Sequence, residues 1–243
     1  MVIRENERIE TRNLIINLLS REELEHLLPH IEAVDLERSE VLFEVGNAVR
    51  HVYFPVDSIH SVVTVTSDGQ TVEAGVVGYE GICGVERLLA EGPVVNQHMT
   101  QVPGRAHRVP IEIAQQLFAG GGPFQQMVLG FVRAYITQVS QSALCNRIHQ
   151  SERRLAKWLA NCRDRATGDN ISLTQEFMAI MLGANRTSVT FAAQRLQDLG
   201  FIKYSRGRLT VIDRKGLSNF ACECYSTIRD EYKRMNGGSF PAA

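Results

Sequence analysis

An arginine and two threonines follow a tight turn in the last third of the chain, and their side chains are suited to contacting the edges of DNA bases. Asn185 is a favoured N-cap residue, and we expect it to open a helix over residues 186–199. Apolar residues recur every three or four positions and would hold this helix against a core: Val189, Ala193 and Leu196. The opposite side of the helix would then be exposed.

That exposed side carries polar and basic groups with one aromatic residue: Arg186, Thr187, Ser188, Thr190, Phe191 and Gln194. Arginine forms a bidentate pair with guanine, and threonine offers a hydroxyl and a methyl group. In a helix that reads the major groove, the N-terminal residues face the base edges. Phe191 is apolar for an exposed position, so it either touches a thymine methyl or is partly buried.

A shorter helix is expected before the turn. Ser172 or Thr174 would cap its N-terminus, and Gly183 would end it. The first turn of a helix has free N–H groups, so the region of Thr174 and Gln175 is suited to binding a phosphate.

A basic hairpin is expected after the reading helix. Its strands would cover residues 201–204 and 209–212, and the connection between them carries Arg206 and Arg208, which are suited to phosphate contacts. Two helices joined by a tight turn and followed by such a hairpin form a winged helix-turn-helix. We therefore expect this part of the chain to bind double-stranded DNA.

Charge is divided unevenly along the chain. Residues 1–149 hold 11 Lys and Arg against 18 Asp and Glu, whereas residues 150–243 hold 15 against 9, so the balances are −7 and +6. Either the second part meets a polyanion or the charge is simply solvated surface. Helical pairs with short turns are common, but a pair together with a basic hairpin in a basic half-chain favours DNA.

A long helix is predicted from Pro123 to about Ile148, some 38 Å at about 1.5 Å per residue. One stripe along it is our predicted dimerisation face: Val128, Val132, Tyr135, Val139 and Ser142. A second stripe overlaps it: Leu129, Val132, Ile136, Val139 and Ala143. The apolar surface is wider than one seam needs, so one side can cover other elements and another can meet a second copy. The alternative is a helix packed only within its own chain.

The first half of the chain changes pattern after residue 31. Residues 14–31 predict a helix, in which Ser20 and Glu23 have the spacing of a capping box. From residue 34 to about residue 109, short β-branched runs alternate with turns, and Asp68-Gly69 is typical of a hairpin. This predicts an antiparallel roll or barrel, followed by a short helix over residues 111–118.

These patterns give an α+β protein with four parts. We expect a β-roll sensor domain over residues 14–121, a dimerisation helix and linker over 122–149, a winged helix-turn-helix over 150–234 and a flexible tail over 235–243. The dimer would be formed by two copies of the same chain.

Five cysteines are present: Cys83, Cys145, Cys162, Cys222 and Cys224. Their odd number and the lack of a secretory signal argue against a disulfide framework. Cys222 and Cys224 form a C-x-C pair without a second pair or a histidine cluster nearby in the sequence, so zinc-ligand spacing is not met. We predict no metal site and expect buried thiols instead.

The composition fits a globular protein, with 44% apolar and 22% charged residues. The longest apolar run, residues 177–184, is far shorter than the roughly 20 residues that span a membrane, so we expect no membrane association and a cytoplasmic location. The sequence lacks the P-loop, GxSxG, HExxH and GxGxxG patterns, and we do not expect an enzyme.

The chain resembles the Crp/Fnr transcription regulators, over about residues 14–234. The resemblance is carried by Leu173-Thr174-Gln175-Glu176, Met181-Leu182-Gly183, Arg186-Thr187-Ser188-Val189-Thr190, Leu199-Gly200-Phe201-Ile202 and the hairpin after it, and more loosely by Val52-Tyr53-Phe54-Pro55 and Gly78-Tyr79-Glu80-Gly81. It implies a β-roll similar to cyclic-nucleotide-binding domains, a long dimerisation helix, a winged helix-turn-helix and RNA polymerase as a partner. Arg186 matches the base-reading arginine of the family. Thr187 stands where well-known members have Glu and Phe191 where they have a basic residue, so the preferred half-site can differ.

The resemblance fails at the nucleotide pocket. Family members that bind cyclic nucleotides use a Gly-Glu pair for the ribose and an Arg-Ser pair for the phosphate. Those positions fall near Val85 and near Val95-Asn96 here, and no arginine occurs between Arg87 and Arg105. We therefore expect no cyclic AMP binding of the family's kind, unless a shifted register brings Glu86 or Arg87 into place.

An iron–sulfur cluster and haem are two other sensor groups that such a domain could hold. The family's N-terminal cysteine cluster is missing, because no cysteine precedes Cys83, so an iron–sulfur cluster is not expected. We predict no cofactor. Haem stays open, because the chain has seven histidines: His26, His30, His51, His60, His98, His107 and His149.

The alternative function is a ligand-binding regulatory module whose C-terminal helices contact a protein rather than DNA. The basic hairpin and the arginine-threonine face argue against it. The sequence does not indicate the signal, the operator or whether the protein activates or represses.

Overall fold

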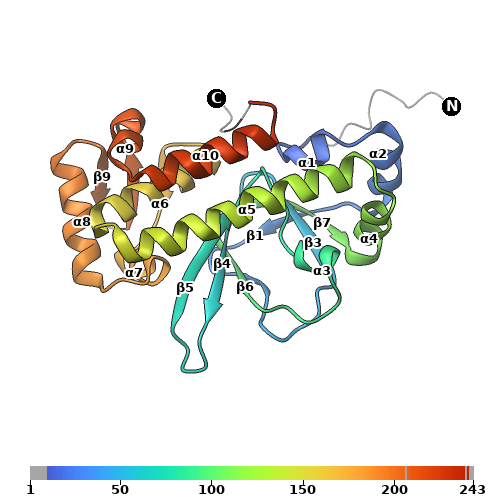
Figure 1. The fold of residues 1–243 in the computed structure, drawn as a ribbon, viewed down its shortest axis with the longest axis horizontal. Helices are drawn as coiled ribbons and strands as arrows, with labels where there is room; N and C mark the ends of the chain where they lie inside the picture. The colour runs from blue at the N-terminus through green and yellow to red at the C-terminus, as the bar shows by residue number, and fades with distance from the viewer. Residues whose placement is uncertain (1–9, 206, 239, 241–243) are drawn as a thin grey trace.

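The computed structural model describes residues 10–205, 207–238 and 240, and these residues form an α+β fold as expected. An N-terminal β unit lies below the long helix α5, and a helical C-terminal unit lies at one end of it (Figure 1). Among the described residues, no helix combines the length and apolar character needed to cross a bilayer.

The N-terminal helical segment is divided into three short helices: α1 (Leu14–Asn17), α2 (Arg21–Leu27) and the 3-10 helix η1 (Leu28–His30). The prediction of one helix over residues 14–31 was therefore wrong. Ser20 is an N-cap with extended backbone, and it forms the expected capping box with Glu23. A residue in that conformation begins a new helix and cannot continue an earlier one.

Seven strands follow in the order β1 (Glu32–Leu36), β2 (Val41–Phe43), β3 (His51–Pro55), β4 (Ile59–Val65), β5 (Thr71–Val77), β6 (Gln97–Val102) and β7 (Gly104–Pro110). They make two antiparallel sheets, with orders β1-β7-β3 and β2-β6-β4-β5. The turn between β4 and β5 holds Gly69 at φ +84°, as the Asp68-Gly69 pair predicts.

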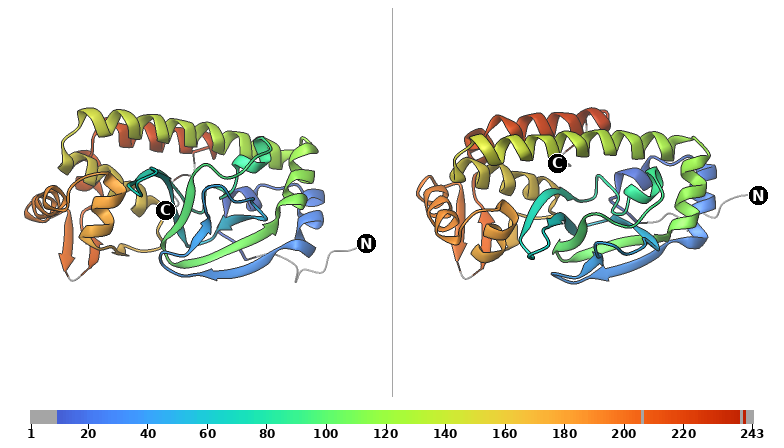
Figure 2. Two further views of the ribbon diagram at one scale, coloured as in Figure 1. Left: turned by 90° about the horizontal axis from the view of Figure 1, so that it is seen from below. Right: turned by 60° about the horizontal axis from the view of Figure 1, so that its bottom comes forward.

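Three helices complete this half of the chain: α3 (Glu86–Leu89), α4 (Ile111–Ala119) and α5 (Pro123–Ile148). The long helix has the predicted bounds, and it runs across the β unit (Figure 2). Two glycines allow the close approach. A Cβ on Gly81 would lie 2.3 Å from the Phe131 ring, and a Cβ on Gly75 would lie 2.5 Å from Gln138 Nε2.

The C-terminal unit contains α6 (Ser151–Arg165), α7 (Gln175–Leu182), α8 (Arg186–Asp198), α9 (Arg214–Phe220) and α10 (Glu223–Met235), with the strands β8 (Asn170–Ser172), β9 (Ile202–Ser205) and β10 (Arg208–Val211). The strands form one antiparallel sheet in the order β8-β10-β9, so the expected hairpin gains a third strand.

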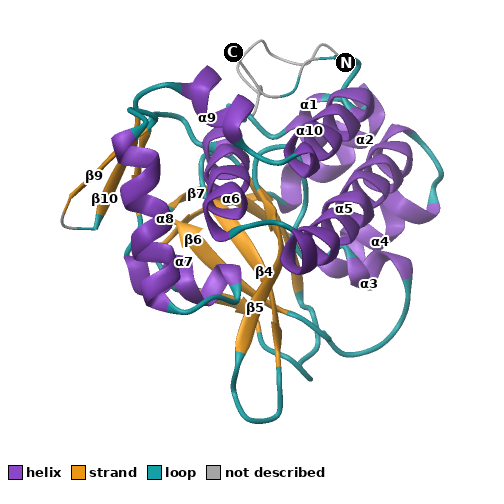
Figure 3. Cartoon of the chain, turned by 60° about the vertical axis from the view of Figure 1, so that its left-hand side comes forward, coloured by secondary structure: helices purple, strands orange, loops and turns teal. Residues whose placement is uncertain are grey.

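The last helix, α10, returns along α5 in the opposite direction (Figures 1 and 3). Arg133 Nε lies 2.8 Å from Glu231 Oε1, and Tyr232 is fully buried beside Phe131. Beyond α10, Phe240 is 2% exposed and packs on Tyr232, within the stretch that we expected to be a flexible tail.

The two units share buried surface. One core joins the β unit to α1, α4, α5 and α10, and a second joins the helices of the C-terminal unit. Val63 of β4 is 1% exposed and belongs to the second core, so the β unit contributes directly to the packing of the C-terminal helices.

Candidate nucleic-acid interface

The turn between α7 and α8 is defined by two caps and one glycine. Thr174 accepts a hydrogen bond from the Phe177 N–H and caps α7, whereas Ser172, the other candidate cap, lies in β8. Gly183 ends α7 with φ +55°, a left-handed conformation that favours glycine. Asn185 then caps α8 by accepting from the Ser188 N–H over 2.7 Å.

The two faces of α8 separate as the sequence predicts. The inward residues Val189, Ala193 and Leu196 are at most 1% exposed. On the other side, Arg186, Thr187, Thr190 and Gln194 are exposed, Ser188 is half-buried and Phe191 is 71% exposed. Of the two alternatives for Phe191, the partly buried one is therefore wrong, and its ring is open to a partner.

Polar contacts between α7 and α8 orient the exposed face. Thr190 Oγ1 donates to Gln175 Oε1 over 3.1 Å, and Arg186 Nε lies 4.0 Å from Glu176 Oε2. Both side chains of that ion pair are more than 60% exposed, so it is weak and solvent-screened. A DNA base or phosphate can therefore replace Glu176 as the partner of Arg186 with little loss of free energy from the broken ion pair.

The hairpin of β9 and β10 lies beside the N-terminus of α7. A shallow cavity between them is lined by Thr174, Gln175, Glu176, Arg186, Tyr204 and Gly207. Arg208 is exposed at the start of β10. Arg206, the other predicted phosphate contact, lies outside the described residues. The structure thus brings the α7 N-terminus, the α8 N-terminus and the hairpin to one surface.

The predicted dimerisation stripe lies at the edge of the surface that α5 packs against its own chain. Val128 is fully buried, and Val132, Tyr135, Val139 and Ser142 are half-buried. Of the four large apolar side chains that the described part of α5 exposes, two belong to the second stripe, Leu129 at 47% and Ile136 at 60%, and the other two are Leu144 and Ile148 near the end of the helix. The two stripes share Val132 and Val139, and successive residues of a helix are rotated by about 100°, so the stripes lie next to each other on the surface of α5.

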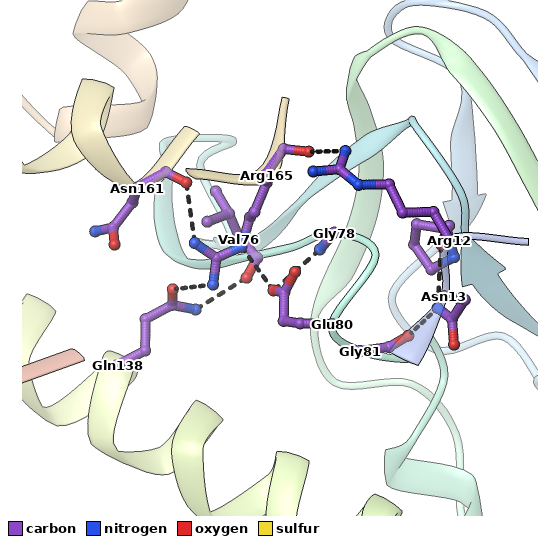
Figure 4. Close-up of polar contacts among 10 residues, drawn as sticks. Arg12, Asn13, Val76, Gly78, Glu80, Gly81, Gln138, Asn161 and Arg165 are labelled. Atoms are coloured by element: carbon purple, nitrogen blue, oxygen red, sulfur yellow. Dashed lines mark hydrogen bonds and ion pairs between the residues drawn. The ribbon is translucent and has the colours of Figure 1, made fainter. Parts of the chain in front are cut away.

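A fully buried ion pair joins the β unit to the C-terminal unit (Figure 4). Arg165, the last residue of α6, donates from Nε to Glu80 Oε1 over 2.6 Å, and neither side chain is exposed. Glu80 also accepts from the Gly78 N–H, while Arg165 reaches Gln138 of α5. Gln138 in turn donates to the Val76 carbonyl, so β5, α5 and α6 share one hydrogen-bonded network.

A second polar link lies on the same boundary. Glu73 of β5 accepts from Trp158 Nε1 of α6 over 2.8 Å and from Ser61 Oγ of β4 over 2.7 Å. Burial raises the pKa of the Glu73 carboxyl to about 7, although Ser61, Trp158 and the charge of Lys157 oppose this shift. The protonation of this link therefore changes near neutral pH.

The β4–β5 hairpin also reaches α7 and α8. A cavity between them is lined by residues of both units, from Thr64–Val72 on the hairpin and from Glu176–Arg186 on α7 and α8. A Cβ on Gly183 would lie 3.1 Å from Val72 Cγ2. β5 therefore packs closely against α7 and the turn that follows it (Figure 3).

The positions where relatives hold a cyclic nucleotide carry other contacts here. Val85 is 7% exposed and Val95 is 67% exposed. Glu86 pairs with His98 over 2.9 Å, and Arg87 pairs with Glu91. Of the histidines considered for haem, His60 is fully buried, which lowers its pKa to about 3.

The cysteines are all buried and carry free thiols, as expected. Four ligand groups that the sequence did not indicate as a set nevertheless lie together: Cys145, His149, Cys222 and Cys224, whose ligand atoms lie within 4.8 Å of one another. The prediction of no metal site relied on ligands close in sequence. These come in two pairs separated by more than 70 residues, and only the C-x-C and C-x3-H spacings within each pair hinted at them.

Comparison with known proteins agrees with this arrangement. A family model described as the Crp-like helix-turn-helix domain matches residues 153–220. No curated protein matches the sequence significantly.

Solved structures of low sequence identity share the fold. A Crp/Fnr-family regulator from Eubacterium rectale superposes with a TM-score of 0.65 at 14% identity, covering 84% of this chain and 95% of that one. FixK2 from Bradyrhizobium japonicum gives 0.65 at 15% identity, covering 79% and 98%. A Crp/Fnr-family regulator from Thermus thermophilus gives 0.60 at 17% identity, covering 78% and 98%.

Proposed function

We propose that the chain is a Crp/Fnr-type DNA-binding transcription regulator, because residues 153–220 match the Crp-like helix-turn-helix domain. It would bind a near-palindromic DNA site as a homodimer, with α8 in the major groove. The single observation that carries this proposal is the exposed face of α8, whose N-terminal turn bears Arg186, Thr187 and Thr190 beside the α7 N-terminus and the hairpin. Each of these three elements has a role in groove-binding proteins of this design.

The proposed contacts divide by chemistry. Arg186, Thr187, Thr190, Phe191 and Gln194 would meet base edges. Phosphates would be bound by a second group: Thr174, Gln175, Asn185, Ser188, Arg206 and Arg208. We expect a stronger preference for thymine next to the guanine that Arg186 contacts, because the Phe191 ring offers a large apolar surface to the thymine methyl group.

Two copies are needed to read a palindrome. The apolar stripe that α5 leaves exposed supports pairing through Leu129, Val132, Ile136, Val139 and Ala143 rather than through the more buried neighbouring stripe. Two α8 helices would then enter successive major grooves, about 34 Å apart. RNA polymerase as a further partner is suggested by the family resemblance alone.

The β unit would act as the sensor. Its links to α6 through Glu80 and Glu73 support this role, because a ligand that shifts β5 would also shift the position of α6 and α8. We propose that the signal is not cyclic AMP, since Val85 and Val95-Asn96 provide neither the carboxylate nor the guanidinium that would bind its ribose and phosphate.

The test is selection of bound DNA from a random pool by the full-length protein. We expect an enriched inverted repeat whose half-sites lie one helical turn apart. An enriched single half-site would disprove the homodimer reading, and a pool without enrichment would favour the alternative in which the C-terminal helices contact a protein. Binding should weaken steeply as salt is raised, because phosphate contacts release counterions.

A further inference from the structure

Four metal-ligating side chains meet where α5 ends and α10 begins. Cys145 lies at the start of the last turn of α5, and His149 is its C-cap residue. Cys222 is the N-cap residue of α10, and Cys224 lies in its first turn. The four ligand atoms all lie within 4.8 Å of one another.

Two of their separations match the edges of a tetrahedral zinc site. Cys145 Sγ lies 3.6 Å from Cys222 Sγ, and Cys224 Sγ lies 3.7 Å from His149 Nδ1. With Zn–S bonds of about 2.3 Å, tetrahedral geometry places two thiolate sulfurs about 3.8 Å apart. The widest pair in the cluster needs to close by only about 1 Å to reach that geometry.

The surroundings of the cluster also fit a bound metal. The three cysteines form a small buried cluster of their own, separate from the two main cores. His149 presents Nδ1 to Cys224, and its Nε2 lies 3.2 Å from Glu223 Oε1. A carboxylate on the far nitrogen is the usual outer partner of a metal-bound histidine, because it fixes the ring orientation and the tautomer.

Charge balance favours the same ligand. Zn²⁺ with three thiolates and one neutral imidazole carries a net charge of −1. Lys157 is only 6% exposed, and its positive charge acts on Cys145 and Cys224. The positive end of the α10 dipole also lies at Cys222 and Cys224. A buried anionic cluster would therefore be compensated.

We propose that Cys145, His149, Cys222 and Cys224 bind one Zn²⁺ ion. Four protein ligands leave no open position, so the site is structural rather than catalytic. It joins the C-terminal end of α5 to the N-terminus of α10, and so it fixes the peptide junction between α5 and α6 from which the C-terminal unit departs. The proposal does not depend on DNA binding or on the dimer.

The direct test is the metal content of the full-length protein, purified without a histidine tag and without chelators. We expect close to one zinc per chain by mass spectrometry of the metals. Cys222→Ser should lose it, and this change is well suited to the test, because serine is a better N-cap than cysteine and leaves α10 intact. Cys83→Ser is the control, since it removes a buried thiol outside the cluster and should keep the zinc.

A second readout distinguishes the site from adventitious binding. Cobalt added to the metal-free protein should give the intense visible bands of tetrahedral Co²⁺ together with thiolate-to-cobalt charge transfer, and Cys222→Ser should lose both. A weak octahedral cobalt spectrum in the wild type would overturn the proposal. So would a zinc-free protein whose mass shows that Cys145 and Cys222 have lost two hydrogens to a disulfide, and so would iron in place of zinc.

Discussion

The Arg165 guanidinium and the Glu80 carboxylate form an ion pair 2.6 Å long with both side chains fully buried. The two residues lie 85 positions apart, one at the end of α6 and the other just after β5. Arg165 also lies over the Tyr232 ring, 4.9 Å from its centroid, so α10 closes the pair from a third side. This single contact joins the β unit, the first helix of the C-terminal unit and the last helix of the chain.

Removing one partner of this pair should strongly destabilise the protein. Arg165→Met leaves the Glu80 carboxylate buried without its counter-charge, and we expect a loss of about 3–5 kcal/mol in the free energy of unfolding. Urea denaturation followed by tryptophan fluorescence measures it, because Trp158 lies in the same helix.

The matched comparisons are a double variant and an exposed pair. Arg165→Met with Glu80→Leu should recover much of the loss, since no unpaired charge then remains buried. Arg21→Met breaks an exposed pair with Glu25 and should change stability by less than about 1 kcal/mol. Equal effects at the buried and exposed pairs would contradict this interpretation.

Glu73 should make stability depend on pH between about 4.5 and 7. Its pKa rises from 4.5 to about 7 on folding, because burial disfavours the charged carboxylate. In this window the folded state holds more protons than the unfolded state, so the contribution of Glu73 to stability is fully present below the unfolded pKa and is lost as pH rises through the folded pKa. A pKa difference of this size corresponds to at most about 3–4 kcal/mol.

Glu73→Gln isolates this effect, because glutamine keeps the shape and the hydrogen-bonding capacity but does not titrate. The difference in unfolding free energy between variant and wild type should grow in favour of the variant from pH 4.5 to pH 7, and then level off. A difference that is constant across this range would show that Glu73 keeps an ordinary pKa in the folded protein. Ser61→Ala, which removes a hydrogen bond that lowers the pKa, should move the wild-type midpoint upward.

Arg186→Ala tests base reading. The side chain is 70% exposed and its ion pair with Glu176 is 4.0 Å long, so the fold should be unaffected. We expect a loss of about 1–3 kcal/mol in DNA-binding free energy and relaxed preference at one base pair of each half-site. Arg195→Ala, near the other end of α8, removes the same charge and should leave base preference unchanged. Unaltered selectivity in the Arg186 variant would remove this residue from the reading face.

Ile136→Glu tests the proposed pairing of two α5 helices. Ile136 is 60% exposed in the single chain, so a charge there should disturb only a contact with a second copy. Light scattering should show a dimer for the wild type and a monomer for the variant, and the variant should bind a full palindrome no better than a half-site. Leu18→Glu, at an apolar position 49% exposed on another surface, is the control and should remain dimeric.

Most features that the sequence predicted correctly depend on residues close together in the chain. The bounds of α5, the caps Asn185 and Gly183, and the two faces of α8 follow from sequence spacing, because each depends on neighbours within a few turns. The one large local error, a continuous helix over residues 14–31, arose because apolar spacing continued across Ser20 while its capping box ended the helix.

Contacts between segments that are far apart in the sequence could not be predicted from its local patterns. Nothing in the spacing of Glu80 and Arg165 indicates that they pair, and the pairing of β8 with β10 depends on a three-residue strand with no pattern of its own. The four ligands of the proposed zinc site are brought together only because α10 returns to the end of α5. The choice between two overlapping stripes on α5 likewise needed the position of the β unit.

The return of α10 along α5 gives the polypeptide a property that its linear order does not suggest. The C-terminal unit is held to the long helix both by the peptide bond after His149 and by the packing of Tyr232 and Glu231 against α5. A protease that cut the backbone between α5 and α6 would therefore produce two fragments that migrate together in native gel filtration. The two fragments would separate only after denaturation, because the packing of α10 on α5 holds them together without a covalent bond.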